Sequence, residues 1–271
     1  MPVRETGSLK LWQRRTSRES LSHWVMWLAG VAVFAYCWQQ ISDATTWFFV
    51  WDAPTITQDI WSRATPPKWS YITQLGEPIW DTLNIATLGT LISLILAVPV
   101  AFLAARNTTP SALFIRPIAL LIIVATRSIN SLIWALLLIA IIGPGVFAGV
   151  IAIAIRSIGF CAKLLYEAIE EIDATQVEAI TATGASRWQV MAYGIVPQIM
   201  PAFAGIAVFR WDINIRESTV LGLVGAGGIG LQLSSSLNVL AWPQVSLILL
   251  VILAAVVISE WVSAKVRAAI I

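Results

Sequence analysis

Long stretches without a charged side chain constrain the fold of this sequence more than any other feature. A helix needs about 20 predominantly apolar residues to cross the hydrocarbon core of a bilayer. Most of the stretches that lack Asp, Glu, Lys and Arg approach or exceed that length, and they are Trp24–Ile41, Thr82–Ala105, Pro117–Thr126, Ser128–Ile155 and Ala241–Ser259. The chain is therefore expected to cross a membrane several times.

The composition agrees with a membrane protein and excludes other classes. Hydrophobic residues make up 58% of the 271 residues and charged residues only 12%, whereas a soluble domain carries about 25% charged residues. Disordered segments are poor in apolar residues, so disorder is excluded. A net charge of +2 leaves no basic surface for nucleic acid, and two cysteines cannot form a disulfide scaffold.

Six spans are predicted, in an all-α polytopic membrane bundle that forms one domain. Gly143–Gly145 separates two of them, because Gly-Pro-Gly is typical of a turn. The predicted spans are 24–41, 82–105, 115–142, 145–165, 197–223 and 241–262. A count of five is the alternative, since the segment around Arg210 carries charges that could keep it out of the membrane.

The distribution of basic residues predicts the orientation, because cytoplasmic loops carry an excess of Lys and Arg. Residues 1–22 are rich in Arg and Lys and are interpreted as a cytoplasmic tail before an uncleaved anchor. The connection 42–81 contains only Arg63 and Lys68 as basic residues, which places it outside. Both termini are then cytoplasmic.

The predicted domain organisation follows from this orientation. Residues 23–81 comprise the first span and an external Trp-rich loop, which is either a connector or a docking surface. Residues 82–265 form the membrane core, which includes a cytoplasmic segment at 167–190.

The second span carries a row of small side chains. Residues four apart lie on one face of a helix, and small residues allow helices in a membrane to approach closely. The row consists of Gly89, Ser93, Ala97, Ala101 and Ala105. This face is predicted to pack against another helix, the alternative being a chance pattern in an Ala-rich segment.

The segment between the fourth and fifth spans, 166–193, is too polar to cross a membrane and is predicted to form two helices separated by Gly184. Its Glu178-Ala179-Ile180 followed by Gly184, with Pro197 at the thirteenth position after that glycine, resembles the EAA-x3-G signature of binding-protein-dependent ABC importer permeases. An inert loop is the other reading of this segment.

The sequence departs from that signature at Ile180, Gly194 and Val196, where the family has Ala, Ile and Leu. The resemblance implies the type I ABC importer permease (MetI-like) fold. It also implies that the segment is a coupling helix seated in a groove of an ATPase dimer, with the contact made by Glu178, Ala179, Gly184 and Ala185.

The Gly-rich run 225–230 matches G-x-G-x-x-G but lacks the context of a dinucleotide site, which follows a strand and precedes an acidic residue about 20 positions on. It is interpreted as a tight external turn. No phosphate-binding loop, hydrolase or metalloprotease motif occurs, and His23 is the only histidine. We therefore expect no enzymatic activity, cofactor or metal, and ATP hydrolysis on a separate subunit.

Three arginines are predicted to lie deep in the membrane on different helices. At 1.5 Å per residue, Arg127 and Arg156 lie about 15 Å and 14 Å from the cytoplasmic face and Arg210 about 20 Å. Charged residues at such depth are costly and mark an interior or a water-filled pathway.

Further polar residues surround these arginines. A fourth arginine, Arg216, lies close to Arg210 in the sequence. Asp212 and Glu217 are able to pair with two of these four arginines, which leaves two positive charges. Guanidinium matches phosphate-type oxygens two at a time, and hydrogen bonds could come from Ser128, Asn130, Asn214 and Ser218. An anion path is the favoured interpretation, and structural ion pairing is the alternative.

The segments Arg127–Asn130, Arg156–Gly159 and Arg210–Ser218 resemble the permease of phosphonate/phosphite importers. That resemblance implies a bacterial inner-membrane complex of two permeases, two ATPases and one external binding protein, embedded in lipid. The implied cargo is an alkylphosphonate or phosphite anion. The alternatives are a permease of the same fold for another solute, such as methionine or another oxyanion, and a secondary carrier.

Overall fold

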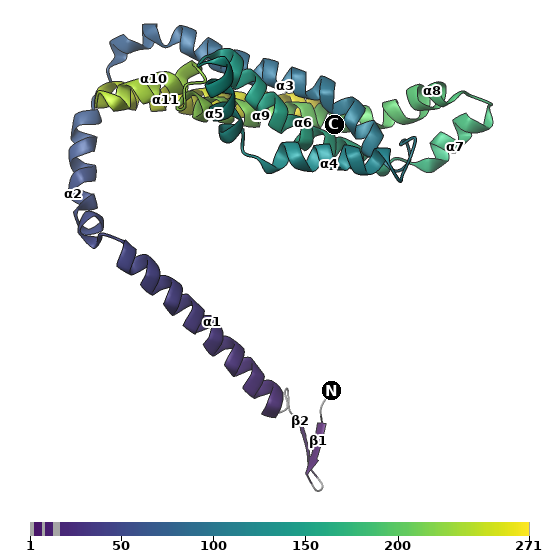
Figure 1. Ribbon diagram of the computed structural model, residues 1–271, viewed down its shortest axis with the longest axis horizontal. Helices are drawn as coiled ribbons and strands as arrows, with labels where there is room; N and C mark the ends of the chain where they lie inside the picture. The colour runs from purple at the N-terminus through teal and green to yellow at the C-terminus, as the bar shows by residue number, and fades with distance from the viewer. Residues whose placement is uncertain (1–2, 7–8, 13–16, 271) are drawn as a thin grey trace. The chain divides into compact units, whose positions relative to one another are not determined.

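The computed structural model describes residues 3–6, 9–12 and 17–270. Contacts divide the chain into two compact units, residues 1–62 and 63–271. The described residues are helical apart from one short hairpin and the connecting turns, which confirms the all-α prediction (Figure 1). Residues 1–2, 7–8 and 13–16 of the predicted cytoplasmic tail lie outside the described part.

The first unit contains an antiparallel hairpin and the first long helix. The hairpin pairs β1 (Val3–Thr6) with β2 (Leu9–Trp12). Helix α1 (Ser17–Ala44) contains the predicted first span.

The predicted Trp-rich external loop is largely helical. It contains α2 (Trp47–Ala64) and the 3₁₀ helix η1 (Trp69–Gln74). Proline removes a backbone hydrogen bond and usually ends or bends a helix, but Pro54 lies inside α2.

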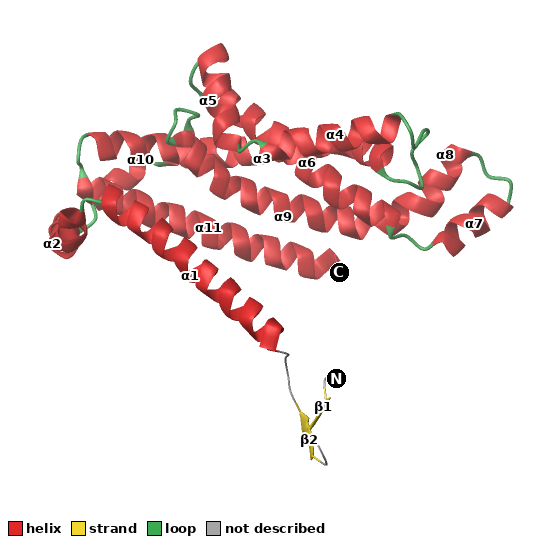
Figure 2. Ribbon diagram, turned by 60° about the horizontal axis from the view of Figure 1, so that its bottom comes forward, coloured by secondary structure: helices red, strands yellow, loops and turns green. Residues whose placement is uncertain are grey.

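The second unit is a bundle of long helices with short helices at both ends. Figure 2 shows α3, α6, α9 and α11 running along one another, with α7 and α8 beyond one end and α10 at the other. The helices are α3 (Gly76–Ala104), α4 (Ile115–Ser128), α5 (Ser131–Ile142), α6 (Val146–Glu170), α7 (Ala174–Ala182), α8 (Arg187–Val190), α9 (Val196–Gly222), α10 (Gly228–Asn238) and α11 (Trp242–Ile270), with the π-helix η2 (Met191–Ile195) between α8 and α9.

Five helices in the described part are long and apolar enough to cross a membrane. They are α1, α3, α6, α11 and the continuous run 187–222 that ends in α9. The charged segment around Arg210 is therefore an uninterrupted helix with the length and composition of a span. Helix α6 continues to Glu170, beyond the predicted boundary at 165.

The predicted span 115–142 is not one straight helix, which is a correction to the sequence analysis. It consists of α4 and α5, which meet at 85° and make a sixth crossing only if counted together. Ile129 and Asn130 adopt extended backbone conformations, and the Asn130 side chain accepts a hydrogen bond from the Leu132 amide at 3.1 Å. Asparagine is a favoured N-cap, so the local sequence starts a second helix in a new direction.

The small residues predicted on the second span do form a packing face. Gly89, Ser93, Ala97, Ala101 and Ala105 are all buried. At Gly89, an added Cβ would lie 2.7 Å from Cγ2 of Ile153 on α6. Close contact between α3 and α6 therefore depends on the missing side chain, as expected where packing drives helix association in lipid.

The Gly-rich run forms the predicted tight turn, between α9 and α10. Gly225, Gly227 and Gly228 have φ of +100°, +85° and +71°, a region open to glycine at little cost. An added Cβ at Gly222 would lie 2.5 Å from the Gly227 carbonyl. The turn thus needs glycine for its backbone conformation and for its close packing.

Candidate functional site

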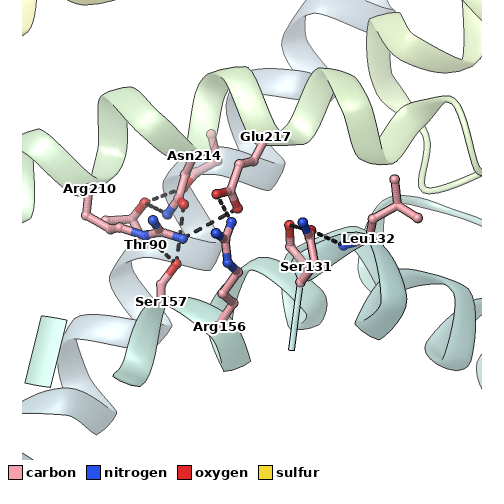
Figure 3. A network of polar contacts seen from close by, with 10 residues as sticks. Thr90, Ser131, Leu132, Arg156, Ser157, Arg210, Asn214 and Glu217 are labelled. Carbon is pink, nitrogen blue, oxygen red and sulfur yellow. Dashed lines mark hydrogen bonds and ion pairs between the residues drawn. The ribbon is translucent and has the colours of Figure 1, made fainter. Parts of the chain in front are cut away.

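Charged and polar side chains lie together in the middle of the bundle, where α9 packs against α3 and α6. Arg210 is the most deeply buried of the charged residues, with 2% of its surface exposed. Its Nε donates to Ser157 Oγ at 2.9 Å, and its Nη2 lies 3.4 Å from Glu217 Oε2 (Figure 3). Its guanidinium lies 5.1 Å from the centre of the Phe160 ring. Arg210 is therefore held from three sides.

Glu217 joins two arginines from different helices. Its Oε2 faces Arg210 on the same helix, and its Oε1 forms an ion pair with Nη1 of Arg156 on α6 (Figure 3). A carboxylate that bridges two guanidinium groups offsets part of the cost of burying them. Structural ion pairing, the alternative predicted for these buried charges, is thus present at Glu217.

A chain of hydrogen bonds extends from Arg210 across three helices. Ser157 Oγ, which accepts from Arg210, donates to Asn214 Oδ1 at 3.3 Å, and Asn214 Nδ2 donates to Thr90 Oγ1 at 2.8 Å. Thr90 donates in turn to the Ala86 carbonyl at 2.6 Å. Asn214 is fully buried, so this chain satisfies polar groups that have no access to water.

A second ion pair lies on α9 itself. Arg216 pairs with Asp212 one helical turn away, and Asp212 Oδ1 accepts from Ser259 Oγ of α11 at 2.9 Å. Asp212 is buried, whereas the Arg216 side chain is 45% exposed. Ser218 donates to the carbonyls of Ile215 and Thr82 at 2.8 Å and 3.2 Å, which ties α9 to α3.

A pocket of about 320 Å³ lies beside these ion pairs, between α5, α6 and α9. Arg156 and Arg216 reach it with 30% and 45% of their side chains exposed, and Glu217 reaches it with 16%. Its apolar lining is Leu132, Ile213, Val220 and Leu221. The lining of the pocket therefore combines apolar side chains with two arginines and one carboxylate.

The N-terminus of α5 completes the polar side of this pocket. Asn130 and Ser131 line it, and Asn130 caps the helix. The first N–H groups of a helix lack intrahelical partners and favour anions. Sequence reasoning included Asn130 but missed Ser131 and the helix end. The signal that could have revealed them is an N-cap residue directly before the apolar run 131–142.

The structure separates some of the residues that the sequence analysis grouped. Arg127 and Ser128 end α4 and are exposed, and Ser128 donates to the Val124 carbonyl at 2.5 Å. Arg127 makes no ion pair with a described residue and does not line the pocket. Arg210, Asp212, Asn214 and Ser218 lie behind the pocket wall rather than on it.

The charges nevertheless remain unbalanced. Three guanidinium groups, on Arg156, Arg210 and Arg216, face two carboxylates, which leaves one positive charge in the cluster. With Arg127 the excess is two, as the sequence analysis counted. No group of three or more His, Cys, Asp or Glu among residues 3–6, 9–12 and 17–270 is placed to hold a metal ion.

The segment with the EAA-like signature lies apart from this cluster, in α7 and α8. Glu178 and Ala179 are exposed on α7, and Gly184 has φ of +81° in the turn that follows. Asp173 caps α7 by accepting from the Thr175 amide at 2.9 Å. The predicted helix–glycine–helix arrangement is therefore present, with the Glu178 and Ala179 side chains of the EAA-like signature exposed.

Gln198 connects this segment to α9. Its Oε1 accepts from the Asp173 amide at 2.9 Å, and its Nε2 donates to the Gly194 carbonyl at 2.7 Å. Gly194, one of the departures from the signature, is buried, and an added Cβ would lie 3.4 Å from Ile180 Cδ1. Gln198 thus links the N-cap of α7 to η2 and to the first turn of α9.

Curated proteins with similar sequences are transport permeases. The chain is 39% identical over 238 residues to the phosphite transport system permease protein PtxC of Stutzerimonas stutzeri, covering 88% of this chain and 85% of that one. It is 39% identical over 205 residues to the phosphate-import permease protein PhnE of Mycolicibacterium smegmatis, covering 76% of this chain and 38% of that one.

A solved structure of similar fold is the inward-facing MetNI methionine ABC transporter, with a TM-score of 0.65, 19% identity and coverage of 74% of this chain and 98% of that chain. At this identity the likeness shows the fold, which is that of ABC importer permeases. Residues 97–268 match the family model described as "Binding-protein-dependent transport system inner membrane component". That match covers more than half of the sequence and includes both the pocket arginines and the EAA-like segment. The chain belongs to this family of inner-membrane transport permeases.

Proposed function

We propose that this permease carries phosphite or a closely related phosphorus oxyanion across a bacterial inner membrane, as a subunit of an ATP-driven importer. The named activities of the relatives support this cargo, since they are a phosphite permease and a phosphate-import permease. The pocket between α5, α6 and α9 is the site that binds the anion transiently during transport.

One observation carries the proposal for the pocket. Arg156 and Arg216 both line the same pocket of about 320 Å³ with partly exposed side chains, and residues at the N-terminus of α5 line it as well. A guanidinium fork matches two oxygens of a tetrahedral oxyanion, and the helix end adds N–H donors. The remaining apolar wall would accommodate the P–H or P–C face of phosphite or a phosphonate.

The partners follow from the family and the exposed α7. A pair of ATPase subunits would receive α7, with Glu178, Ala179, Gly184 and Ala185 at the contact. A binding protein would deliver the anion at the outer face, and a second copy of this chain would complete the path within the lipid. ATP-driven closure of the ATPases would move α7, and Gln198 would transmit this movement to α9. The termini would both be cytoplasmic.

Arginine substitution in the assembled importer tests the cargo path. Arg156→Ala and Arg216→Ala should each reduce phosphite uptake at least about tenfold, because each removes a charged hydrogen-bond donor from the pocket. Lys163→Ala is the matched control. Lys163 lies on α6 like Arg156, but it pairs with Glu167 at 3.5 Å and is not part of the pocket lining.

Uptake should be measured in proteoliposomes that contain the permease, its ATPase and its binding protein. The control variant should transport phosphite at the wild-type rate. If both pocket variants transport as well as the control, the pocket is not on the path of the anion.

A further inference from the structure

Glu217 is the one carboxylate among the residues that line the pocket. It lies between the two arginines with which it pairs, Arg156 on α6 and Arg210 on its own helix. Its carboxylate therefore already occupies the position of an anion beside Arg156. A carboxylate, like a phosphorus oxyanion, accepts two hydrogen bonds from a guanidinium fork.

The two partners of Glu217 differ in how firmly they are held. The side chain of Arg210 is 3% exposed and also contacts Ser157 and the Phe160 ring. These contacts hold Arg210 in place independently of Glu217. Arg156 is 30% exposed, and Glu217 is its ion-pair partner in the described part of the chain. Arg156 is thus the partner that is free to exchange one oxyanion for another.

We infer that Glu217 is a resident counter-anion that the cargo displaces from Arg156. This inference rests on the proposed function. In the empty pocket, Glu217 compensates Arg156 and Arg210. When the anion arrives, Arg156 and Arg216 bind its oxygens, while Glu217 stays paired with Arg210. On release, Glu217 returns to Arg156 and keeps the anion from rebinding.

The charges in the cluster explain why such a competitor is useful. Without Glu217, three guanidinium groups would face a single carboxylate, on Asp212. Arg210 is buried, and charges beside a buried group attract one another more strongly than charges in bulk water, so an oxyanion would bind tightly there and leave slowly. A carboxylate in the pocket lowers the affinity to a value that allows transport.

Equilibrium binding of phosphite distinguishes this role from a structural one. The permease–ATPase complex is placed in nanodiscs without the binding protein, and phosphite is titrated by calorimetry, with inorganic phosphate in parallel. Glu217→Gln should bind phosphite about tenfold more tightly than the wild type, because the competing charge is gone. A purely structural Glu217 would give weaker binding, since its loss would disorder the arginines.

Glu170→Gln is the matched control. Glu170 also interacts with two arginines, with Arg116 Nη2 at 3.5 Å and Arg106 Nε at 3.9 Å, but it is not part of the pocket lining. Its loss should leave phosphite affinity unchanged. In the complete importer, Glu217→Gln should also lower the maximal rate of uptake, because release becomes slow.

A double variant covers the case in which Glu217→Gln does not fold. Removing one partner of a buried ion pair is strongly destabilising, whereas removing both is often tolerated. Arg210→Gln combined with Glu217→Gln leaves no buried unpaired charge and should still bind phosphite more tightly than the wild type.

Two results would overturn parts of this scheme, and they are distinguishable. Phosphite affinity that is unchanged or lower in a folded Glu217 variant refutes the counter-anion role alone, provided that Arg156→Ala and Arg216→Ala weaken binding. Wild-type affinity in both of those arginine variants refutes the proposed pocket itself.

Discussion

Replacement of Gly89 by alanine tests the close contact between α3 and α6. The added Cβ would lie 2.7 Å from Ile153 Cγ2, 3.0 Å from Ile153 Cβ and 3.2 Å from the Val150 carbonyl oxygen. Favourable contacts between carbon atoms lie at about 3.5–4.0 Å, so one helix would have to move by up to about 1 Å. Ile153 and Val150 are themselves buried, so little room exists for such a shift.

The expected cost can be stated from this geometry. Overpacking of a well-packed interior costs about 1–3 kcal/mol, and the contact here includes both backbone and a β-branched side chain. For a domain of this size, 1 kcal/mol changes the melting temperature by about 2–4 °C. Gly89→Ala should therefore lower the melting temperature of the purified permease by several degrees.

A control and a rescue make the result specific. Gly205 lies in α9 with no atom within 4 Å of an added Cβ, so Gly205→Ala should leave the melting temperature unchanged or raise it slightly, because alanine favours helix. Ile153→Ala removes the nearest methyl group, so the cost of Gly89→Ala should be smaller in that background, a coupling that a double-mutant cycle measures. If Gly89→Ala melts within about 1 °C of Gly205→Ala, the packing argument is wrong.

Two further predictions concern α9. Asn214→Ala breaks the hydrogen-bond chain between Ser157 and Thr90 and should destabilise the permease by about 1–3 kcal/mol, because buried polar groups lose their partner; a melting temperature equal to the wild type would contradict this role. Gln198→Ala removes the link between the Asp173 amide and the Gly194 carbonyl, and it should reduce the amount of phosphite transported per ATP hydrolysed while leaving the fold intact. An unchanged ratio in proteoliposomes would show that α7 transmits its movement by another route.

The sequence predicted the spans well where a single helix crosses without interruption. The predicted spans 82–105 and 241–262 fall on the longer helices α3 (Gly76–Ala104) and α11 (Trp242–Ile270), because an apolar stretch long enough for the bilayer must be helical to satisfy its backbone there. The span predicted over 115–142 is divided into α4 and α5, which meet at 85° beside the N-cap Asn130, a bend that the continuous apolar composition did not reveal. The Trp-rich segment was predicted only as an external connection, and its helix α2 was not anticipated.

Depth along a helix was a partial guide to the candidate site. It correctly grouped Arg156 with Arg210, which meet through Glu217. It also grouped Arg127 with them, although the structure places Arg127 at the exposed end of α4. Depth specifies how far a residue lies along the helix axis but not the direction in which its side chain points, so membership of the pocket could not be predicted.

The sequence by itself determined that this chain is a helical membrane permease. The length of its apolar segments, the spacing of its small residues and the EAA-like signature are all patterns among residues close together in the sequence. Tertiary structure alone decided which charges meet. Arg156 and Glu217 are 61 residues apart, and they pair only because α6 and α9 pack side by side. The bend at Asn130 likewise brings the end of α5 to the same pocket. Contacts between distant segments depend on how whole helices pack, and such packing is not encoded in the neighbourhood of any one residue.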